Sequence, residues 1–237
     1  MLIRYANSQE TSSFASVLEQ IIISRGVRRI LEIGGGANPT FPFEFVSKYA
    51  LEYTVLDISQ GELDKAPQGY LKVLADITSP SLDLSGGYDL IFSKWLAEHV
   101  QNGEIFHRNV YRLLAHGAVA FHFFPTLYAP PYVVNRLMPE RLAEGLLQML
   151  QTGRDKKGKK AKFPAYYSWC LGPTQAQVKR FEHLGYRVDE YVGFFGHAPY
   201  YMKLPVLAKA HHALSNWLVR HPVPWLTSFA FVKLVKE

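Results

Sequence analysis

Glu32 and the three glycines from Gly34 to Gly36 bring together groups that suit the binding of a nucleotide-containing ligand. An apolar run of strand length, beginning at Arg29, leads directly into them. Glycines permit the backbone angles of a tight turn and let a ligand approach a main chain that carries no Cβ. The N–H groups of such a turn, and the N-terminus of a helix that follows it, attract an electronegative group. The segment therefore predicts a ligand-cradling turn between a strand and a helix.

Two further carboxylates follow predicted strands. Asp57 ends the run 53–57 and lies 21 positions after Gly36. An acid at the end of the second strand is well placed to accept hydrogen bonds from the two hydroxyls of a ribose. Asp76 follows the run 70–75 in the same way. The alternative interpretation of both acids is that they are ordinary turn residues that cap the local backbone.

The residues around the glycines distinguish between two classes of cofactor-binding motif. The dinucleotide fingerprint of dehydrogenases requires a glycine at its sixth position, where this chain has Pro39. The pattern Glu32-x-Gly34-x-Gly36 instead resembles motif I of the class I S-adenosylmethionine (SAM)-dependent methyltransferases, with Asn38 in place of a third glycine. Asn38 followed by Pro39 also predicts that a helix is capped and begins there.

A second segment carries the same resemblance. Leu96-Ala97-Glu98-His99 follows the predicted strand 88–93 and is similar to the fourth motif of that family, with one additional residue. The resemblance covers residues 27–124, and its closest form is the type 11 and type 12 methyltransferases of bacteria. It implies SAM as the cofactor, with Asp57 on the ribose, Asp76 on the adenine amino group and Ile77 against the ring. The cofactor-binding residues that it implies are Glu32, Gly34, Gly35, Gly36, Asn38, Asp57, Ile58, Asp76, Ile77 and Ser93.

Strand-length and helix-length segments alternate along the chain, which predicts an α/β fold. We expect a Rossmann-like, doubly wound sheet of seven strands, in which five parallel strands are followed by a C-terminal strand pair. The later strands are expected at 118–124, from Gly185, and at 226–235, and the helices at 10–25, 41–50, 103–115, 139–150, 174–184 and 204–220. Ligands of such sheets bind outside the carboxyl ends of the strands, where the motifs fall.

The length predicts a single methyltransferase domain, 1–237, with two insertions. Residues 125–173 follow the fifth strand and are expected to form a substrate lid. Residues 194–225 lie between the sixth and seventh strands. The resemblance places both insertions beside the acceptor pocket. The alternative is that they serve only for peripheral packing or for an oligomer contact.

Transfer of a sulfonium methyl is an in-line displacement that requires alignment and, for an alcohol acceptor, a base. His99 is the candidate catalytic base because it comes directly after the fourth strand. The alternative is a histidine hydrogen-bonded to the main chain at the start of a helix. His122 is expected in the core, and His197 could be either a core or a site residue. No metal constellation is present, because the adjacent pair His211 and His212 diverges on a helix.

Composition and charge limit the location and the partners. Hydrophobic residues make up 48% of the chain, charged residues 19%, and the single cysteine predicts a reducing cytoplasm. The sequence shows neither a signal peptide nor an apolar run of the ~18 residues that span a membrane, which leaves only peripheral membrane contact open. Six basic residues and one acid in 154–162 account for most of the formal net charge of +6. This segment is either a solvated loop or a site for a phosphate or an acidic surface, and its isolation argues against a nucleic-acid track.

The predicted function is methyl transfer from SAM to a small-molecule or glycan acceptor, at an oxygen atom. Aromatic side chains are concentrated in 121–137 and 194–202, and flat rings with polar edges suit a sugar face or an extended apolar acceptor. The alternative function is a non-catalytic protein that keeps the SAM fold and binds a ligand or partner through its insertions. The sequence does not determine the oligomeric state.

Overall fold

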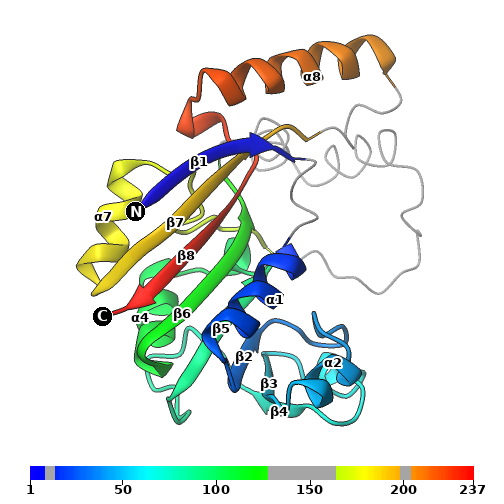
Figure 1. Ribbon diagram of the computed structural model, residues 1–237, viewed down its shortest axis with the longest axis vertical. Helices are drawn as coiled ribbons and strands as arrows, with labels where there is room; N and C mark the ends of the chain where they lie inside the picture. The colour runs from blue at the N-terminus through cyan, green and yellow to red at the C-terminus, as the bar shows by residue number, and fades with distance from the viewer. Residues whose placement is uncertain (9–13, 128–163, 198–203) are drawn as a thin grey trace.

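The computed structural model describes residues 1–8, 14–127, 164–197 and 204–237, and within them it contains one mixed sheet of eight strands (Figure 1). The strand order is β1-β7-β8-β6-β5-β2-β3-β4. The strands are β1 (Leu2–Asn7), β2 (Arg29–Ile33), β3 (Glu52–Asp57), β4 (Leu71–Leu74), β5 (Tyr88–Lys94), β6 (Leu114–Pro125), β7 (Tyr186–Phe195) and β8 (Phe229–Lys236). The predicted Rossmann-like α/β class is confirmed.

The register of the parallel strands brings their carboxyl ends to one edge. Ile33 at the end of β2 pairs with Leu56 of β3 and with Ser93 of β5, and Ser93 pairs with His122 of β6. Adjacent strands lie about 4.8 Å apart. The segments that follow these strands therefore emerge side by side, and this row of strand ends is called the carboxyl edge below.

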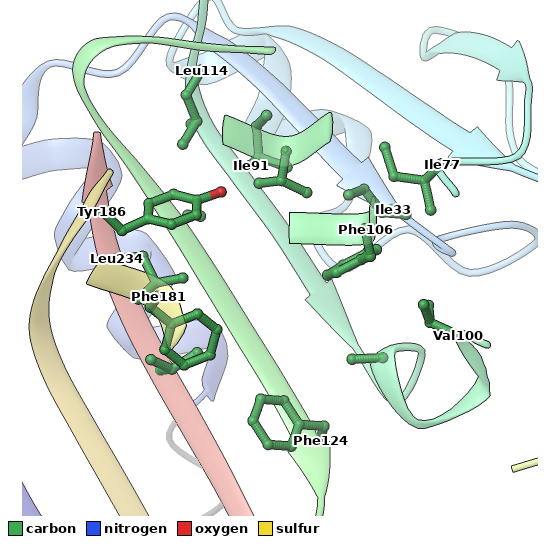
Figure 2. Packing of buried hydrophobic residues seen from close by; sticks show 14 of the residues in the cluster. Ile33, Ile77, Ile91, Val100, Phe106, Leu114, Phe124, Phe181, Tyr186 and Leu234 are labelled. Atoms are coloured by element: carbon green, nitrogen blue, oxygen red, sulfur yellow. The ribbon is translucent and has the colours of Figure 1, made fainter. Parts of the chain in front are cut away.

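Helices cover both faces of the sheet, as expected of a doubly wound fold. The helical elements are α1 (Phe14–Arg25), α2 (Phe43–Lys48), α3 (Gln60–Leu63), η2 (Ala97–His99), α4 (Gly103–Leu113), α7 (Gln175–His183), α8 (Pro205–Arg220) and η4 (Pro224–Leu226). One core cluster joins the sheet to α1, α2 and α3, and the other joins it to α4 and α7. Figure 2 shows the second cluster, where Phe106 of α4 and Phe181 of α7 lie over strand residues such as Ile91 and Leu234. None of the helices in the described part of the chain is both long enough and apolar enough to cross a bilayer.

The structure corrects two predicted elements. The sequence pattern predicts seven strands and does not reveal β1, which pairs in parallel with β7 at the edge of the sheet. Its pattern is too short and too exposed to stand out, because Ala6 alone is buried in it. The helix expected from Asn38 was also misplaced: α2 begins at Phe43 with Pro42 as its N-cap residue, and Asn38 lies exposed in an extended turn.

Most other boundaries agree to within a few residues. Thr174 caps α7 as predicted, with its hydroxyl accepting a hydrogen bond from the N–H of Gln177 at 3.2 Å. The helix predicted over 204–220 is α8. The strand predicted from Leu226 begins only at Phe229, because the 3-10 turn η4 precedes it. The helix predicted over 139–150, the basic segment 154–162 and most of the first insertion lie outside the described residues.

Candidate active site

The glycine turn lies at the carboxyl edge between β2 and α2. The N–H of Gly34 donates to the carbonyl of Leu56 at 2.7 Å, which ties the start of the turn to the end of β3. Gly34 and Gly36 have φ values of +79° and +41°, in the left-handed region that favours glycine. A Cβ on Gly34 would overlap the Leu96 side chain, and a Cβ on Gly36 would lie 2.9 Å from Asp57 Oδ2. The turn therefore packs directly against two other segments of the candidate site.

Glu32 fixes the path of the glycine turn through hydrogen bonds. Its side chain is 3% exposed, and its carboxylate accepts hydrogen bonds from the Thr40 N–H at 3.0 Å, from Thr40 Oγ1 at 2.5 Å and from the Tyr53 hydroxyl at 2.7 Å. Burial raises its pKa, while the bonds from Thr40 and Tyr53 oppose that shift. A Cβ on Gly35 would lie 2.7 Å from Glu32 Cδ. Because the carboxylate already has these protein partners, its part in the site is to fix the path of residues 34–40.

Asp57 and Ile58 stand at the end of β3 beside Gly36. Asp57 Oδ1 accepts from the Ser59 N–H at 2.9 Å, which fixes the orientation of the carboxylate. Ile58 is 64% exposed, an unusual exposure for a large apolar side chain next to an acid. The pair presents hydrogen-bond acceptors and an apolar contact surface at the same point of the carboxyl edge. Both were candidates in the sequence analysis, and the structure brings them next to the glycine turn.

Asp76 and Ile77, after β4, point in different directions. Asp76 is exposed, and its Oδ1 accepts from the N–H and the hydroxyl of Thr78 at 2.8 and 2.7 Å. Ile77 is only 5% exposed and belongs to the core cluster that contains Ile33 and Ile91 (Figure 2). The expected place of Ile77 against an adenine ring therefore does not fit its position in the structure. The local turn that Asp76 forms is the alternative that the sequence analysis left open.

Ser93 is fully buried at the end of β5, and its hydroxyl forms a hydrogen bond within the sheet. Its hydroxyl lies 2.8 Å from His122 Nδ1. The His122 ring contacts the ring of His107 on α4, with centroids 5.2 Å apart. Burial lowers the pKa of His122 to about 3 and that of His107 well below its usual value, so both rings are neutral at physiological pH. The expectation that His122 is a core residue agrees with this burial, whereas the side chain of Ser93 is withdrawn from the edge.

His99 ends the 3-10 turn η2, which follows β5 at the same edge. Its Nδ1 lies 2.9 Å from the carbonyl oxygen of Pro164. A carbonyl oxygen can only accept a hydrogen bond, so in the neutral ring Nδ1 carries the proton and Nε2 carries the lone pair. His99 Nε2 is 3.7 Å from Glu98 Oε1. The main-chain contact foreseen as the alternative is thus present, and it places the lone pair of a neutral ring on Nε2.

Glu98 is a polar group at this edge that the sequence analysis did not single out. Its side chain is only 7% exposed, and within the described part of the chain Oε2 has no hydrogen-bond partner. Burial raises its pKa to about 8. The N–H groups of Tyr166 and Tyr167 donate to its carbonyl at 2.7 and 3.0 Å, so the segment from Pro164 covers it. No local pattern could have revealed this, because the covering residues are more than sixty positions away.

Trp95 is a second group that the sequence analysis missed. It follows β5 with a φ of +56°, which a bulky residue adopts only when the surroundings enforce it. Its ring packs edge-on against Phe123 and Phe229, with centroids 4.7 and 5.3 Å apart, and yet 42% of the residue is exposed. The signal available in the sequence was an aromatic residue directly after the fourth predicted strand. Trp95 supplies a rigid apolar wall between the glycine turn and β6.

Part of the chain matches a known protein family. Residues 31–121 match the family described as a methyltransferase domain. The matched segment runs from β2 into β6 and so includes the glycine turn, Asp57, Asp76 and His99. No curated protein sequence matches the chain.

Solved structures of similar length share the fold. A SAM-dependent methyltransferase from Clostridium acetobutylicum is 11% identical with a TM-score of 0.57, over 95% of this chain and 91% of that one. Geranyl diphosphate C-methyltransferase from Streptomyces coelicolor, solved with Mg²⁺, geranyl diphosphate and S-adenosyl-L-homocysteine, is 9% identical with a TM-score of 0.57, over 96% and 79%. The cyclase SpnF is 11% identical with a TM-score of 0.55, over 94% and 80%. At these identities the likeness establishes the fold.

Proposed function

Because the chain belongs to the class I SAM-dependent methyltransferases, we propose that it transfers the methyl group of SAM to an oxygen atom of a small-molecule or glycan acceptor. The observation that carries this proposal is the common edge shared by the glycine turn, Asp57 and the segment after β5. In an open parallel sheet this edge is where ligands bind. A cytoplasmic location remains a prediction from the sequence.

The residues at the edge fit the cofactor in shape and in chemistry. A Cβ on Gly36 would lie only 2.9 Å from Asp57 Oδ2. The main chain of Gly36 and the carboxylate of Asp57 are therefore close enough to contact the same ligand. We assign Asp57 to the ribose hydroxyls, because a carboxylate can accept from both. Ile58 supplies the exposed apolar surface for the adenine ring, in place of the buried Ile77. Gly34 to Gly36 and Asn38 form the wall of the site that faces the electronegative groups of the cofactor. Glu32 holds that wall in position through its hydrogen bonds.

The chemistry that SAM supplies is a methyl group already activated by its positive sulfur. The chain must then align the acceptor and accept its proton. We assign proton acceptance to His99 Nε2, the nitrogen that carries the lone pair when Nδ1 donates to Pro164. Trp95 holds the acceptor against the edge through its exposed ring. The acceptor is proposed to enter beside residues 164–169, which cover Glu98 and His99.

Titration calorimetry with SAM and with S-adenosylhomocysteine tests the cofactor assignment. Asp57→Asn keeps the oxygen that accepts from Ser59 but replaces an acceptor by an amide donor, so we expect affinity to fall by about tenfold to a hundredfold for one lost charge-assisted bond. Asp64→Ala, an exposed acid at the end of α3, is the matched control and should bind normally. Unchanged affinity in Asp57→Asn would remove Asp57 from the cofactor site.

Incorporation of labelled methyl into matched glycan, phenolic, lipid, tRNA and protein pools tests the acceptor class. We expect labelling of the glycan or small-molecule pools, and preferential labelling of tRNA or protein would refute the proposal. His99→Asn removes the basic nitrogen but keeps an amide that can donate to Pro164. We expect it to lose most turnover while retaining SAM affinity. Full turnover at every pH would remove the base assignment.

A non-catalytic binding role is the second candidate function. The fold alone does not require methyl transfer, because one solved structure with this fold is named a [4+2]-cyclase, so methyl transfer itself must be tested. SAM binding without methyl transfer to any pool would support this candidate. Labelling of one pool that is abolished by Asp57→Asn would exclude it.

A further inference from the structure

Helix α8 and the residues after it expose an apolar surface. Of the seventeen large hydrophobic residues that are exposed in the described part of the chain, eight lie within 204–226. These eight are Leu204, Val206, Leu207, Leu214, Trp217, Val223, Trp225 and Leu226. In α8 itself, Ser215 and Leu218 are the buried residues. Most of this sixteen-residue helix therefore contributes nothing to the core.

The exposed apolar residues of α8 gather on one side of the helix. Val206, Ala210 and Trp217 are spaced at i, i+4 and i+11, and Leu207 and Leu214 at i and i+7. Residues at these spacings lie close together along one side of an α-helix. We call this set, Val206, Leu207, Ala210, Leu214 and Trp217, the outer face of α8. The exposed fractions of Val206 (82%), Leu214 (53%) and Trp217 (52%) are those of side chains without a substantial cover.

The charged side chains of α8 are all basic. No Asp or Glu occurs between Glu190 and Glu237, and Lys209 and Arg220 lie at one edge of the outer face, again spaced by eleven residues. Glu190 itself lies in the middle of β7 and pairs with Arg4 at 2.9 Å. A helix face that combines Trp and Leu with Lys and Arg, in a stretch of sequence without an acid, is complementary to anionic lipid headgroups over an apolar layer.

The position of α8 connects this surface to the candidate active site. Asn7, the last residue of β1, donates through its side chain to Asn216 at 3.0 Å. The N–H of His197, just beyond the end of β7, donates to His211 Nε2 at 2.9 Å. β1 and β7 run parallel to each other. α8 lies along the carboxyl ends of these two strands, as Figure 1 shows. α8 therefore lies at the edge of the sheet where methyl transfer is proposed, at the ends of β1 and β7.

We propose that the outer face of α8 docks on an anionic lipid surface, with Leu214 and Trp217 inserted at the headgroup boundary and Lys209 and Arg220 against the phosphates. A Trp ring suits this boundary, because its body is apolar and its N–H remains near water. The ring of Trp217 is held by stacking on His221, with centroids 4.8 Å apart. Docking in this way brings the carboxyl edge to the membrane surface, where an acceptor with a lipid portion is concentrated.

The observations favour a lipid surface over a second copy of the chain. Two copies paired through this face would place the Lys209 and Arg220 side chains of both copies close together, with no acid of the 191–236 stretch to neutralise them. A lipid layer with anionic headgroups offers the opposite charge along the whole face. Pairing of two copies is accordingly an outcome that counts against the proposal.

Co-sedimentation of the full chain with vesicles tests the proposal without SAM or any acceptor, so it is independent of the proposed methyl transfer. The probes are vesicles of phosphatidylcholine alone and of phosphatidylcholine with phosphatidylglycerol. The test variant carries Leu214→Ser and Trp217→Ser. Ile23→Ser on α1 is the matched control, because Ile23 has the same exposed fraction as Leu214, 53%. Lys209→Gln with Arg220→Gln tests the charge requirement.

We expect the wild type and Ile23→Ser to bind the phosphatidylglycerol vesicles, and Leu214→Ser with Trp217→Ser to lose at least about tenfold in partitioning, as loss of two buried apolar side chains implies. Removing both basic groups, or raising the salt concentration, should abolish the preference for phosphatidylglycerol. Absence of binding, equal binding to both kinds of vesicle, or unchanged binding by the serine variant would overturn the proposal. A wild-type dimer that the serine variant converts to a monomer, with no vesicle binding, would assign the face to a second copy instead.

Discussion

The buried carboxyl of Glu98 should give this protein a stability that falls as the pH rises. In the unfolded chain a glutamate titrates near its reference pKa of 4.5, whereas burial raises the pKa of Glu98 in the folded protein to about 8. Between these values the folded state holds a proton that the unfolded state has released. Stability from this group is therefore fully present below pH 4.5 and is lost as the pH rises through 8.

The size of the effect follows from the shift. Each tenfold change in proton affinity corresponds to about 1.4 kcal/mol, so the rise in pKa from 4.5 to about 8 costs about 5 kcal/mol at high pH. Between pH 5 and pH 7 the expected loss is about 2.5 kcal/mol. A carboxyl on a side chain that is 7% exposed, with Oε2 unpartnered among the described residues, has no strong screening by water that would reduce this cost.

Glu98→Gln isolates this contribution, because the amide has nearly the same shape and cannot ionise. Urea unfolding of the wild type and of Glu98→Gln at pH 5, 6 and 7 should show the variant gaining about 2.5 kcal/mol relative to the wild type over this range. Other buried groups contribute equally to both proteins and cancel in the difference. Glu104→Gln, an exposed glutamate paired with Arg108 on α4, should follow the wild-type pH dependence. A Glu98→Gln difference that changes by less than about 1 kcal/mol would refute the reasoning.

Three further predictions follow from the same edge of the sheet. Tyr53→Phe removes one hydrogen bond from the buried carboxylate of Glu32 and should lower the free energy of unfolding by about 1–3 kcal/mol, measured by urea denaturation. His122→Asn should flatten the loss of stability below pH 6.5, because the unfolded ring takes up a proton there while burial keeps the folded ring neutral to about pH 3; thermal melts from pH 4 to 7 measure this. Gly36→Ala should weaken SAM binding by calorimetry, because φ is +41° and the new Cβ would crowd Asp57; unchanged affinity would contradict the site.

The cofactor side of the candidate site could be predicted from the sequence because its contacts are short in range. Gly34 and Asp57 fall at the ends of adjacent strands, β2 and β3, whose apolar pattern identifies them. Parallel pairing then brings their ends together without further information. The misplaced start of α2 shows the limit of this reasoning. Asn38 followed by Pro39 is a sound local capping signal, but the bonds from Thr40 to Glu32 hold the chain extended past it.

The remaining features could not be predicted because distant residues create them. β1 is defined by pairing with β7, about 190 positions along the chain, and its own pattern is weak. The high pKa of Glu98 arises from burial under the segment 164–167, which no motif connects to it. Ile77 follows a strand as the family pattern requires, but the core packing around it decides which way the side chain points. Burial of an individual side chain is a property of the whole fold.

This difference in range separates the determinants of cofactor choice from those of acceptor choice. On the acceptor side, His99 is fixed by Pro164 and the N–H of Gly103 by Ser168 Oγ, contacts that each span 65 positions. Substitutions on the exposed surface of 164–169 should therefore change which acceptor is methylated and leave SAM affinity intact, whereas changes at Gly36 or Asp57 should do the reverse. The sequence motif predicts what the protein takes its methyl group from, and under the proposed function the long-range contacts of the second half of the chain are expected to select where that group goes.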